Sequence, residues 1–334
     1  YDTIHSIFFQ YQNSTGFPFG GFWGVDIYKD FNFQLQFYNR EQNTLIELFN
    51  GISLWGRYPY NFGHSLSANH ILDYSFQFMD RVALFDTTRF SSDVFEYPES
   101  GKEGSINLRY AFLNKRNHVR NMFSPNQGYG LEILIKKSSP SLWGDFDYLK
   151  TEIDLYTNRK VGPFSLYGRG RYERMSGDPP DQEKLGIIDI PNYYIAGTLT
   201  PGREYMTPRG YYGKQMGDQA FMGTIELRAP VIPLDIIEVL KVIKFGKPTF
   251  ALISDFGNAW NEGSKMGDWI VTTGAEFRLS LILANAPLFI FSYGWAQSPE
   301  KWNKDWEKLY NTDSVDAIKA GPKPYFQMTL INPF

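Results

Sequence analysis

The 334-residue chain contains no cysteine, which excludes a disulfide framework, thiolate metal sites and a cysteine nucleophile. It also lacks a surplus of one charge, since 33 Lys and Arg stand against 36 Asp and Glu, for a formal net charge of −3. A nucleic-acid partner is therefore not expected, because no face can carry the excess of basic residues that neutralises a phosphate backbone.

Long apolar runs are missing as well. The most apolar stretch, 281–291, is only eleven residues long and includes Asn285, whereas a transmembrane helix needs about 18 or more apolar residues in succession. The mean hydropathy is −0.36. These values exclude a membrane helix but not a membrane β-barrel, whose strands alternate lipid-facing and lumen-facing residues and average out.

Aromatic residues are abundant, at 17% of the chain, and strict alternation of apolar and polar residues is the commonest pattern. Period two with one apolar face is typical of β-strands. In the segment 31–38, for example, Phe31, Phe33, Leu35 and Phe37 interleave with polar residues and Tyr38. The pattern predicts strands near 104–113, 128–138, 146–157, 164–174, 219–229, 248–258, 269–281, 286–296 and 324–334.

The first 103 residues are expected to hold six or seven further strands, beginning near 4–12, 20–29, 31–40 and 44–57. Because single-chain bacterial barrels favour even strand numbers, we expect sixteen in all. Long connections at 175–218, 259–268 and 297–323 alternate with short ones, as outer loops and periplasmic turns do in such barrels. The connection 230–247 breaks this alternation, and we expect a helical turn there.

Trp and Tyr recur near the expected strand ends, as in the aromatic girdles of membrane proteins. These residues are Trp55, Tyr58, Tyr129, Trp143, Tyr148, Tyr156, Trp260, Trp269, Tyr293 and Trp295. The alternative is a soluble β-sandwich, whose strands also alternate but whose large aromatics are concentrated in a core. The distribution of aromatics favours the barrel.

Several motifs occur in a fixed order in the second half of the chain. Thr207-Pro208-Arg209-Gly210-Tyr211 lies in the long loop and precedes the strand segments 223–230, 250–260, 274–278 and 291–296. In order and spacing, this set resembles the C-terminal barrel of the BamA/TamA-type outer-membrane assembly factors, the bacterial surface antigen family. The resemblance covers 104–334 and is vague over 1–103. It implies an all-β fold: a 16-stranded antiparallel transmembrane β-barrel with a long extracellular loop inserted into the lumen.

The resemblance also implies that loop 175–218 folds back into the lumen and that its arginine reaches acidic residues of the barrel wall. Alternation places the candidate acids on the polar faces of their strands. The expected clasp comprises Arg209, Gly210, Tyr211, Glu226, Asp255 and Glu276. Arginine suits this role because its planar fork binds a carboxylate through two hydrogen bonds. The alternative is a solvated loop arginine that contributes about 0–1 kcal/mol.

The last strand, 324–334, alternates and ends in an aromatic residue, which is similar to the targeting signal of outer-membrane barrels, here Phe326 and Phe334. Members of the resembled family are thought to open between their first and last strands and to template client strands by edge addition. The expected seam residues are Phe8, Met328, Leu330 and Pro333. Pro333 has no N–H to donate, so pairing near the terminus is partial; alternatively, Pro333 simply ends the strand.

No catalytic or metal-binding constellation is present. Gly63-His64-Ser65-Leu66-Ser67 fails as a nucleophile elbow at its last position. The four histidines, His5, His64, His70 and His118, show no ligand spacing. We therefore expect no enzymatic activity, no metal and no cofactor.

We expect 1–334 to form a single transmembrane β-barrel domain. Because the chain begins at Tyr1 without an initiator Met, it is interpreted as a processed or truncated product that soluble domains can precede. The expected location is the bacterial outer membrane, and the expected partners are the lipid bilayer, outer-membrane protein clients and periplasmic or membrane accessory subunits. Three functions stay open: an assembly or translocation barrel, a closed barrel that anchors a soluble partner, and a diffusion pore.

Overall fold

The computed structural model describes most of the chain. The described residues are 7–14, 21–38, 41–60, 68–84, 99–116, 127–180, 183, 185–188, 193–196, 208–210, 214–231, 237–240, 243–246, 248–264, 269–283, 286–297 and 323–330. Among these residues, no helix is long and apolar enough to cross a membrane.

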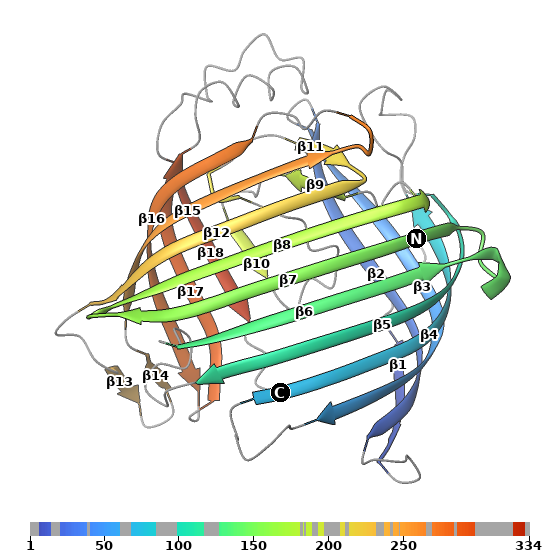
Figure 1. The fold of residues 1–334 in the computed structure, drawn as a ribbon, viewed down its shortest axis with the longest axis horizontal. Helices are drawn as coiled ribbons and strands as arrows, with labels where there is room; N and C mark the ends of the chain where they lie inside the picture. Colours follow the sequence, from blue (N-terminus) through green and yellow to red (C-terminus); the bar gives the residue numbers. More distant parts are fainter. Residues whose placement is uncertain are drawn as a thin grey trace. The chain divides into compact units, whose positions relative to one another are not determined.

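One large sheet accounts for most of the fold (Figure 1), and two of the short strands given below, β11 and β9, form a separate two-stranded sheet. Its strands follow the order β1-β2-β3-β4-β5-β6-β7-β8-β12-β15-β16-β17-β18-β10. The strands of the first half are β1 (Ile7–Asn13), β2 (Phe22–Tyr38), β3 (Glu41–Tyr60), β4 (Ala68–Leu84), β5 (Gly101–Arg116), β6 (Gln127–Ser138), β7 (Asp147–Val161) and β8 (Phe164–Asp178). A single 3-10 turn, η2 (Pro140–Leu142), joins β6 to β7.

The second half contributes long strands and several short ones. The long strands are β12 (Gln219–Pro230), β15 (Thr249–Trp260), β16 (Ile270–Leu283), β17 (Ala286–Gln297) and β18 (Lys323–Leu330). The short strands are β9 (Leu185–Ile188), β10 (Tyr193–Ala196), β11 (Lys214–Gly217), β13 (Ile237–Leu240) and β14 (Ile243–Phe245). Among the described residues the large sheet has sixteen strands, but β10, β13 and β14 are short pieces of connections, so thirteen long strands stand where sixteen spanning strands were predicted.

The nine strands predicted between 104 and 334 are confirmed as elements, most of them with ends within a few residues of the prediction. The last of these was predicted to reach 334, and its final four residues, which include Pro333 and Phe334, lie outside the described residues.

The prediction for the first 103 residues is wrong in strand number, since the described residues there form four complete strands and the start of β5. The segments 20–29 and 31–40 are one strand, β2, which pairs with β3 without a break from Phe22↔Arg57 to Tyr38↔Glu41. No Gly or Pro lies between Tyr28 and Tyr38, so nothing in the backbone ends the strand at Asp30.

The helical turn predicted within 230–247 is also wrong for the residues described there. Strand β13 pairs with β14, and β14 pairs with β16 through Ile243↔Leu283, Lys244↔Ile282 and Phe245↔Leu281. The β-branched Ile237, Val239 and Ile243 favour this extended pairing over a helix.

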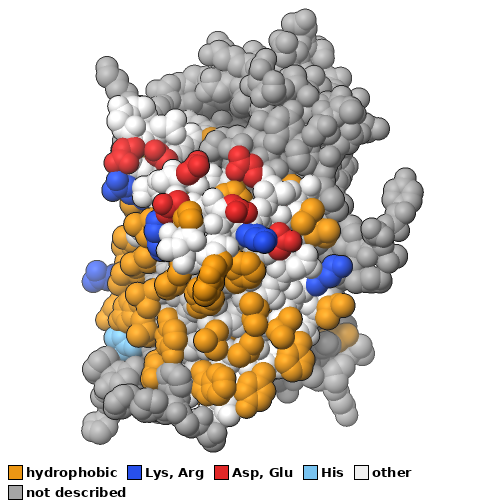
Figure 2. All heavy atoms as spheres, turned by 90° about the vertical axis from the view of Figure 1, so that its right-hand side faces the viewer, with side chains coloured by type: hydrophobic (Ala, Val, Ile, Leu, Met, Phe, Trp, Pro, Cys, Tyr) orange, Lys and Arg blue, Asp and Glu red, His pale blue; other side chains and the backbone are white. Residues whose placement is uncertain are grey.

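Burial alternates along the strands, with large apolar side chains exposed and charged ones buried. On β15, Phe250 and Leu252 are 42% and 51% exposed, whereas Asp255 is 1% exposed. Figure 2 shows hydrophobic side chains gathered into a broad continuous area, with charged side chains at one end of it. This arrangement is the inverse of a β-sandwich core, so the sandwich interpretation fails.

The aromatic residues follow the same alternation, which corrects part of the girdle expected from the sequence. Trp143, Tyr129 and Trp295 are exposed, at 72%, 53% and 46%. Tyr148, in contrast, is fully buried, and the indole Nε1 of Trp55 is buried too. These two rings lie on the polar face of their strands, because their sequence neighbours Leu149 and Leu54 occupy the apolar one.

Contacts divide the chain into two compact units. Unit 1 comprises Tyr1–Leu113, Leu131–Ile153 and Glu173–Leu185, and unit 2 comprises Asn114–Gly130, Asp154–Tyr172 and Gly186–Phe334. Each unit carries its own cluster of buried charges, and the two clusters are described separately below.

Candidate functional site: a buried arginine–carboxylate network

Three adjacent strands of unit 2 place acidic residues on one polar face. Glu226 lies on β12, Asp255 on β15 and Glu276 on β16. The register pairs Thr224 with Asp255 across β12 and β15, and Ala251 with Glu276 across β15 and β16. Since alternate residues of a strand share a face, this register brings the three carboxylates together. Their side chains are 0 to 4% exposed.

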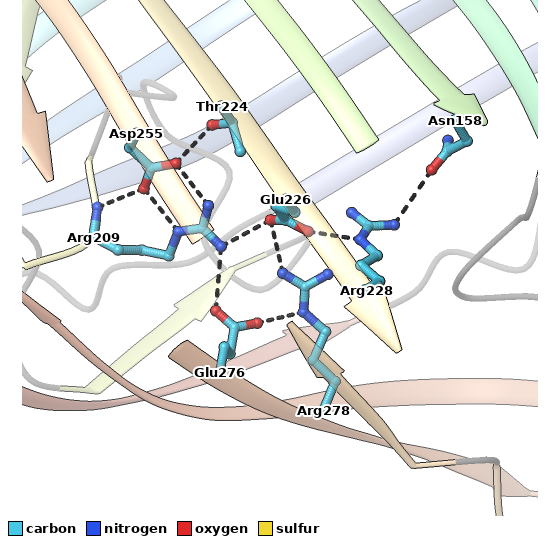
Figure 3. A network of polar contacts seen from close by, with 8 residues as sticks. All are labelled: Asn158, Arg209, Thr224, Glu226, Arg228, Asp255, Glu276 and Arg278. Carbon is cyan, nitrogen blue, oxygen red and sulfur yellow. Dashed lines mark hydrogen bonds and ion pairs between the residues drawn. The ribbon is translucent and has the colours of Figure 1, made fainter. Parts of the chain in front are cut away.

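Arg209 enters this group of acids from the loop between β8 and β12 (Figure 3). Its backbone N–H and its Nε donate to Oδ2 of Asp255, at 2.9 and 2.8 Å, and its Nη2 donates to Oδ1 at 2.6 Å. Its Nη1 donates to Oε1 of Glu226 at 2.8 Å and to Oε2 of Glu276 at 3.3 Å. One guanidinium therefore joins all three carboxylates.

Two strand arginines complete the network. Arg228 Nε donates to Oε2 of Glu226 at 2.6 Å, and Arg278 donates to Oε1 of Glu226 at 2.8 Å and to Glu276. The guanidinium of Arg228 also lies over the ring of Tyr167, 4.1 Å from its centroid. With Arg209 in place, three cations face three carboxylates; without it, the group carries one uncompensated negative charge in a buried setting.

The carboxylates outweigh the effect of burial on Arg209. Burial alone lowers the pKa of an arginine, but Asp255, Glu226 and Glu276 raise the pKa of Arg209 well above its usual value. Thr224 Oγ1 holds Asp255 in place by donating to its Oδ1 at 2.9 Å. The arrangement therefore binds a loop to a sheet through buried charges.

Gly210 is required by the close approach of the loop to β17. Its φ is +74°, a conformation that favours glycine. A Cβ at this position would lie 2.6 Å from the carbonyl carbon of Ala296, which is 1% exposed. The next residue of the motif, Tyr211, lies outside the described residues.

The loop contacts the sheet at two further places. The first is Ile187 of β9, which is fully buried against Gly257 of β15. Strand β10 pairs in parallel with β18, with Tyr193↔Phe326, Tyr194↔Gln327, Ile195↔Met328 and Ala196↔Thr329 in register.

Of the residues expected at the seam, Phe8 belongs to β1, at one end of the sheet order, and Met328 and Leu330 belong to β18, which is next to last at the other end, beside β10. Phe8 lies on β1, pairs with Tyr28 and is 61% exposed. On β18, Phe326, Met328 and Leu330 pair with Tyr293, Phe291 and Phe289 of β17. The pairings described for β1 are with β2, and those described for β18 are with β17 and β10, so closure between β1 and β18 is not among them.

The described residues contain no group of three or more histidine or acidic side chains placed to hold a metal ion. The Nδ1 atom of His70 lies 2.8 Å from the hydroxyl oxygen of Tyr110, and the other three histidines lie outside the described residues.

The sequence analysis missed a second cluster of buried charges, which lies in unit 1 around Arg81. The residues of this cluster occupy polar positions in the alternating pattern of their strands, but they belong to no motif. Only the strand register, which the sequence does not reveal, brings them together.

No protein-family model matches the chain, and no curated protein matches it. Among solved structures, it is similar to BamA from Haemophilus ducreyi lacking POTRA domains 1–3, with 11% identity and a TM-score of 0.57 over 97% of this chain and 61% of that one. It is also similar to CdiB from Escherichia coli, with 10% identity and a TM-score of 0.55 over 96% of this chain and 52% of that one. The chain thus spans less than two thirds of the length of either protein. The resemblance expected from the sequence is confirmed at the level of fold: this all-β chain has the architecture of the BamA and CdiB barrel domains.

Proposed function

We propose that residues 1–334 form one transmembrane β-barrel domain of the bacterial outer membrane, and that it assists the insertion, assembly or translocation of other outer-membrane proteins without enzymatic chemistry. The fold shared with BamA and CdiB supports the membrane setting. So does the exposure of large apolar side chains on one face while Glu226, Asp255 and Glu276 are buried on the other. An apolar outer band around a polar interior is what a bilayer requires of a barrel.

In this proposal, loop 175–218 lies in the lumen and Arg209 fixes it to the wall. Charge-assisted, two-pronged hydrogen bonds are strong in a buried setting and hold one geometry. The loop would then keep the barrel from acting as an open diffusion pore. Arg209, Gly210 and Tyr211, with the three acids, are the proposed clasp.

The lateral seam between β1 and β18 is the proposed working site. The observation that carries it is the pairing of β18: one edge pairs with β17 over eight residues, whereas the only pairing described at its other edge is with four residues of β10, in parallel. A short, parallel partner leaves main-chain groups that an antiparallel client strand would satisfy better. Client strands would add there, at Met328 and Leu330, with Phe8 on the opposite side of the seam and Pro333 limiting pairing beyond it. In the same proposal, the C-terminal segment with Phe326 and Phe334 is the targeting signal of the barrel itself.

The alternative function is a closed barrel that anchors or scaffolds a soluble partner. The buried charge networks of both units hold their strands in one arrangement, and this rigidity favours a barrel that does not open. Periplasmic or membrane accessory subunits are proposed partners in either case.

A disulfide across the seam distinguishes the two functions, because the chain has no native cysteine. Cysteines are placed at Phe8 and Met328 and scanned over neighbouring registers, and each pair is oxidised in the membrane. If one register crosslinks efficiently and outer-membrane protein assembly stops until reductant is added, the seam is a working gate. Efficient crosslinking with unchanged assembly would contradict the gate and support the anchor. Single-cysteine variants under the same oxidation are the control.

A further inference from the structure

The loop that carries Arg209 begins with a tight return over the polar face of unit 1. At the end of β8, Gly177 has a φ of +98°, and a Cβ there would lie 2.3 Å from the backbone oxygen of Asp147 on β7. Pro180, which follows, is fully buried, and its carbonyl accepts a hydrogen bond of 2.8 Å from the backbone N–H of Glu183. This short turn directs the Glu183 side chain toward the strands.

Glu183 meets a buried cation there. Its Oε1 accepts a hydrogen bond from Nη2 of Arg81, on β4, at 2.5 Å. The side chain of Arg81 is 4% exposed and its guanidinium lies 5.4 Å from the centroid of the Phe49 ring. Glu183 itself is 18% exposed, so the pair is largely withdrawn from water.

The surrounding strands supply a balanced set of charges. Nε of Arg81 lies 3.2 Å from Oε2 of Glu103 and 3.7 Å from Oε1 of Glu47, and Nζ of Lys136 lies 2.5 Å from Oε1 of Glu103. Lys136 also lies over the ring of the buried Tyr148. These strand residues alone supply two cations and two carboxylates.

Hydrogen bonding shows what the loop adds. Nε and Nη1 of Arg81 are buried and have no hydrogen-bond partner among the described residues, although Nε lies within ion-pair distance of Glu103 and Glu47. The bond from Nη2 to Glu183 is the one hydrogen bond described for this guanidinium. A buried donor without an acceptor is costly, so Arg81 favours the docked position of Glu183.

We propose that Glu183 is a second positioning residue of the loop 175–218, which holds the first part of the loop on unit 1 through Arg81, as Arg209 holds its later part on unit 2. The two attachments have opposite polarity: a loop anion on a wall cation, and a loop cation on wall anions. This proposal is independent of the seam, because it concerns how the loop is held and can be measured without any client.

Trypsin tests the attachment, because Lys184 directly follows Glu183. The full chain is folded in lipid vesicles, and the rate of cleavage after Lys184 is measured for the parent protein and for Glu183→Gln. Each rate is divided by that of the heat-unfolded chain to remove the effect of the substitution on trypsin itself. We expect Glu183→Gln to be cleaved about tenfold faster or more. Glu132→Gln is the matched control, since Glu132 is a more exposed glutamate of unit 1 that pairs with Arg109, and its rate should equal that of the parent.

A double-mutant cycle separates a direct pair from a general loosening of the fold. Arg81→Lys removes the guanidinium but keeps the charge, and heat-modifiable migration on gels verifies that each variant is folded. If Glu183 acts through Arg81, the variant with both substitutions is cleaved no faster than the faster single variant. Two results would overturn the proposal: a double variant whose cleavage rate rises by the product of the two single increases, or a Glu183→Gln variant that is cleaved at the parent rate.

Discussion

Arg209 and Asp255 are joined by three hydrogen bonds, one from the backbone N–H of the arginine and two from its guanidinium. The backbone hydrogen bond holds the loop main chain against β15, and the two side-chain hydrogen bonds place the positive guanidinium against the negative carboxylate. Residues 46 positions apart in the chain are thereby held in one geometry, and the first two predictions concern this contact.

Replacement of Arg209 by Ala should destabilise the folded protein by about 3–5 kcal/mol, because it leaves Asp255, Glu226 and Glu276 buried with one negative charge uncompensated. Arg209→Lys should recover only part of the loss, since an ammonium cannot make the fork-shaped contact. Urea unfolding in lipid vesicles measures both. Arg169→Ala is the control: Arg169 pairs with Asp154 but its side chain is 43% exposed, so the change should stay within about 0–1 kcal/mol. Equal losses for Arg209→Ala and Arg169→Ala would contradict the network.

Gly210→Ala should release the loop nearly as effectively as Arg209→Ala. The added Cβ would lie 2.6 Å from a buried carbonyl carbon of Ala296, and the backbone conformation is unfavourable for alanine. Gly263→Ala is a matched control, because Gly263 has a φ of +78° but nothing within 4 Å of its Cβ position. It should cost only the backbone strain, about 1–2 kcal/mol. The measurement is the rate at which a protease cleaves the loop 175–218 in each variant. Cleavage should be faster in Gly210→Ala than in Gly263→Ala, and equal rates would argue against close contact of the loop with β17.

The contribution of Glu183 should depend on pH. Burial alone would raise the pKa of the Glu183 carboxyl, but Lys136 and Arg81 outweigh it and hold the pKa well below its usual range. A carboxyl with a lowered pKa stabilises the fold above its unfolded pKa of about 4.3, and this stabilisation is lost as the pH falls below that value. The charged groups around it are Arg81, Lys136, Lys150, Glu47, Glu103 and Glu173, and the neutral phenol of Tyr148 lies beside them.

The measurement is the difference in thermal unfolding midpoint between the parent and Glu183→Gln, followed from pH 7 to pH 3. The difference should be constant above about pH 5 and shrink below about pH 4.3. Glu132→Gln, measured in parallel, corrects for other carboxyls that titrate over the same range. A difference that grows on acidification would show that the sign is wrong.

The parallel pairing of β10 with β18 predicts a specific crosslink. Neighbouring strands lie about 4.8 Å apart, which is within the Cα separation of a disulfide. Cysteines at Ile195 and Met328, which are in register, should therefore form a disulfide in the folded protein, and mass spectrometry of a digest identifies it. Cysteines at Ile195 and Leu330, two residues out of register, should crosslink poorly; the reverse result would place β10 elsewhere on the edge.

The alternation of side chains was sufficient to find the long strands between 104 and 334, because each has one apolar and one polar face and ends near a Gly, Pro or loop. It was insufficient over 1–103. There β2 is 17 residues long, and a prediction based on spans of about ten residues divides it in two. The extended strands β13 and β14 were missed because a short apolar run with no clear period fits a helix as well as a strand.

The two charge clusters differ in how far the sequence reveals them. Arg209 lies in an ordered set of motifs, so a resemblance pointed to Asp255 and Glu226 before any coordinate was known. Arg81 and Glu183 are 102 positions apart and belong to no motif. Their contact follows from strand register and from the turn at Pro180, which are properties of the folded chain and leave no local pattern.

The length of the β2–β3 hairpin has a geometric consequence. Seventeen residues at about 3.3 Å each extend roughly 56 Å, and a tilt of about 45° still leaves roughly 40 Å along the membrane normal. The hydrocarbon layer is only about 30 Å thick. The whole bilayer with its headgroups is about 40–45 Å thick. In the membrane setting proposed above, this hairpin therefore spans the hydrocarbon layer and places roughly 10 Å of its length among the polar headgroups, where its backbone meets the membrane–water interface.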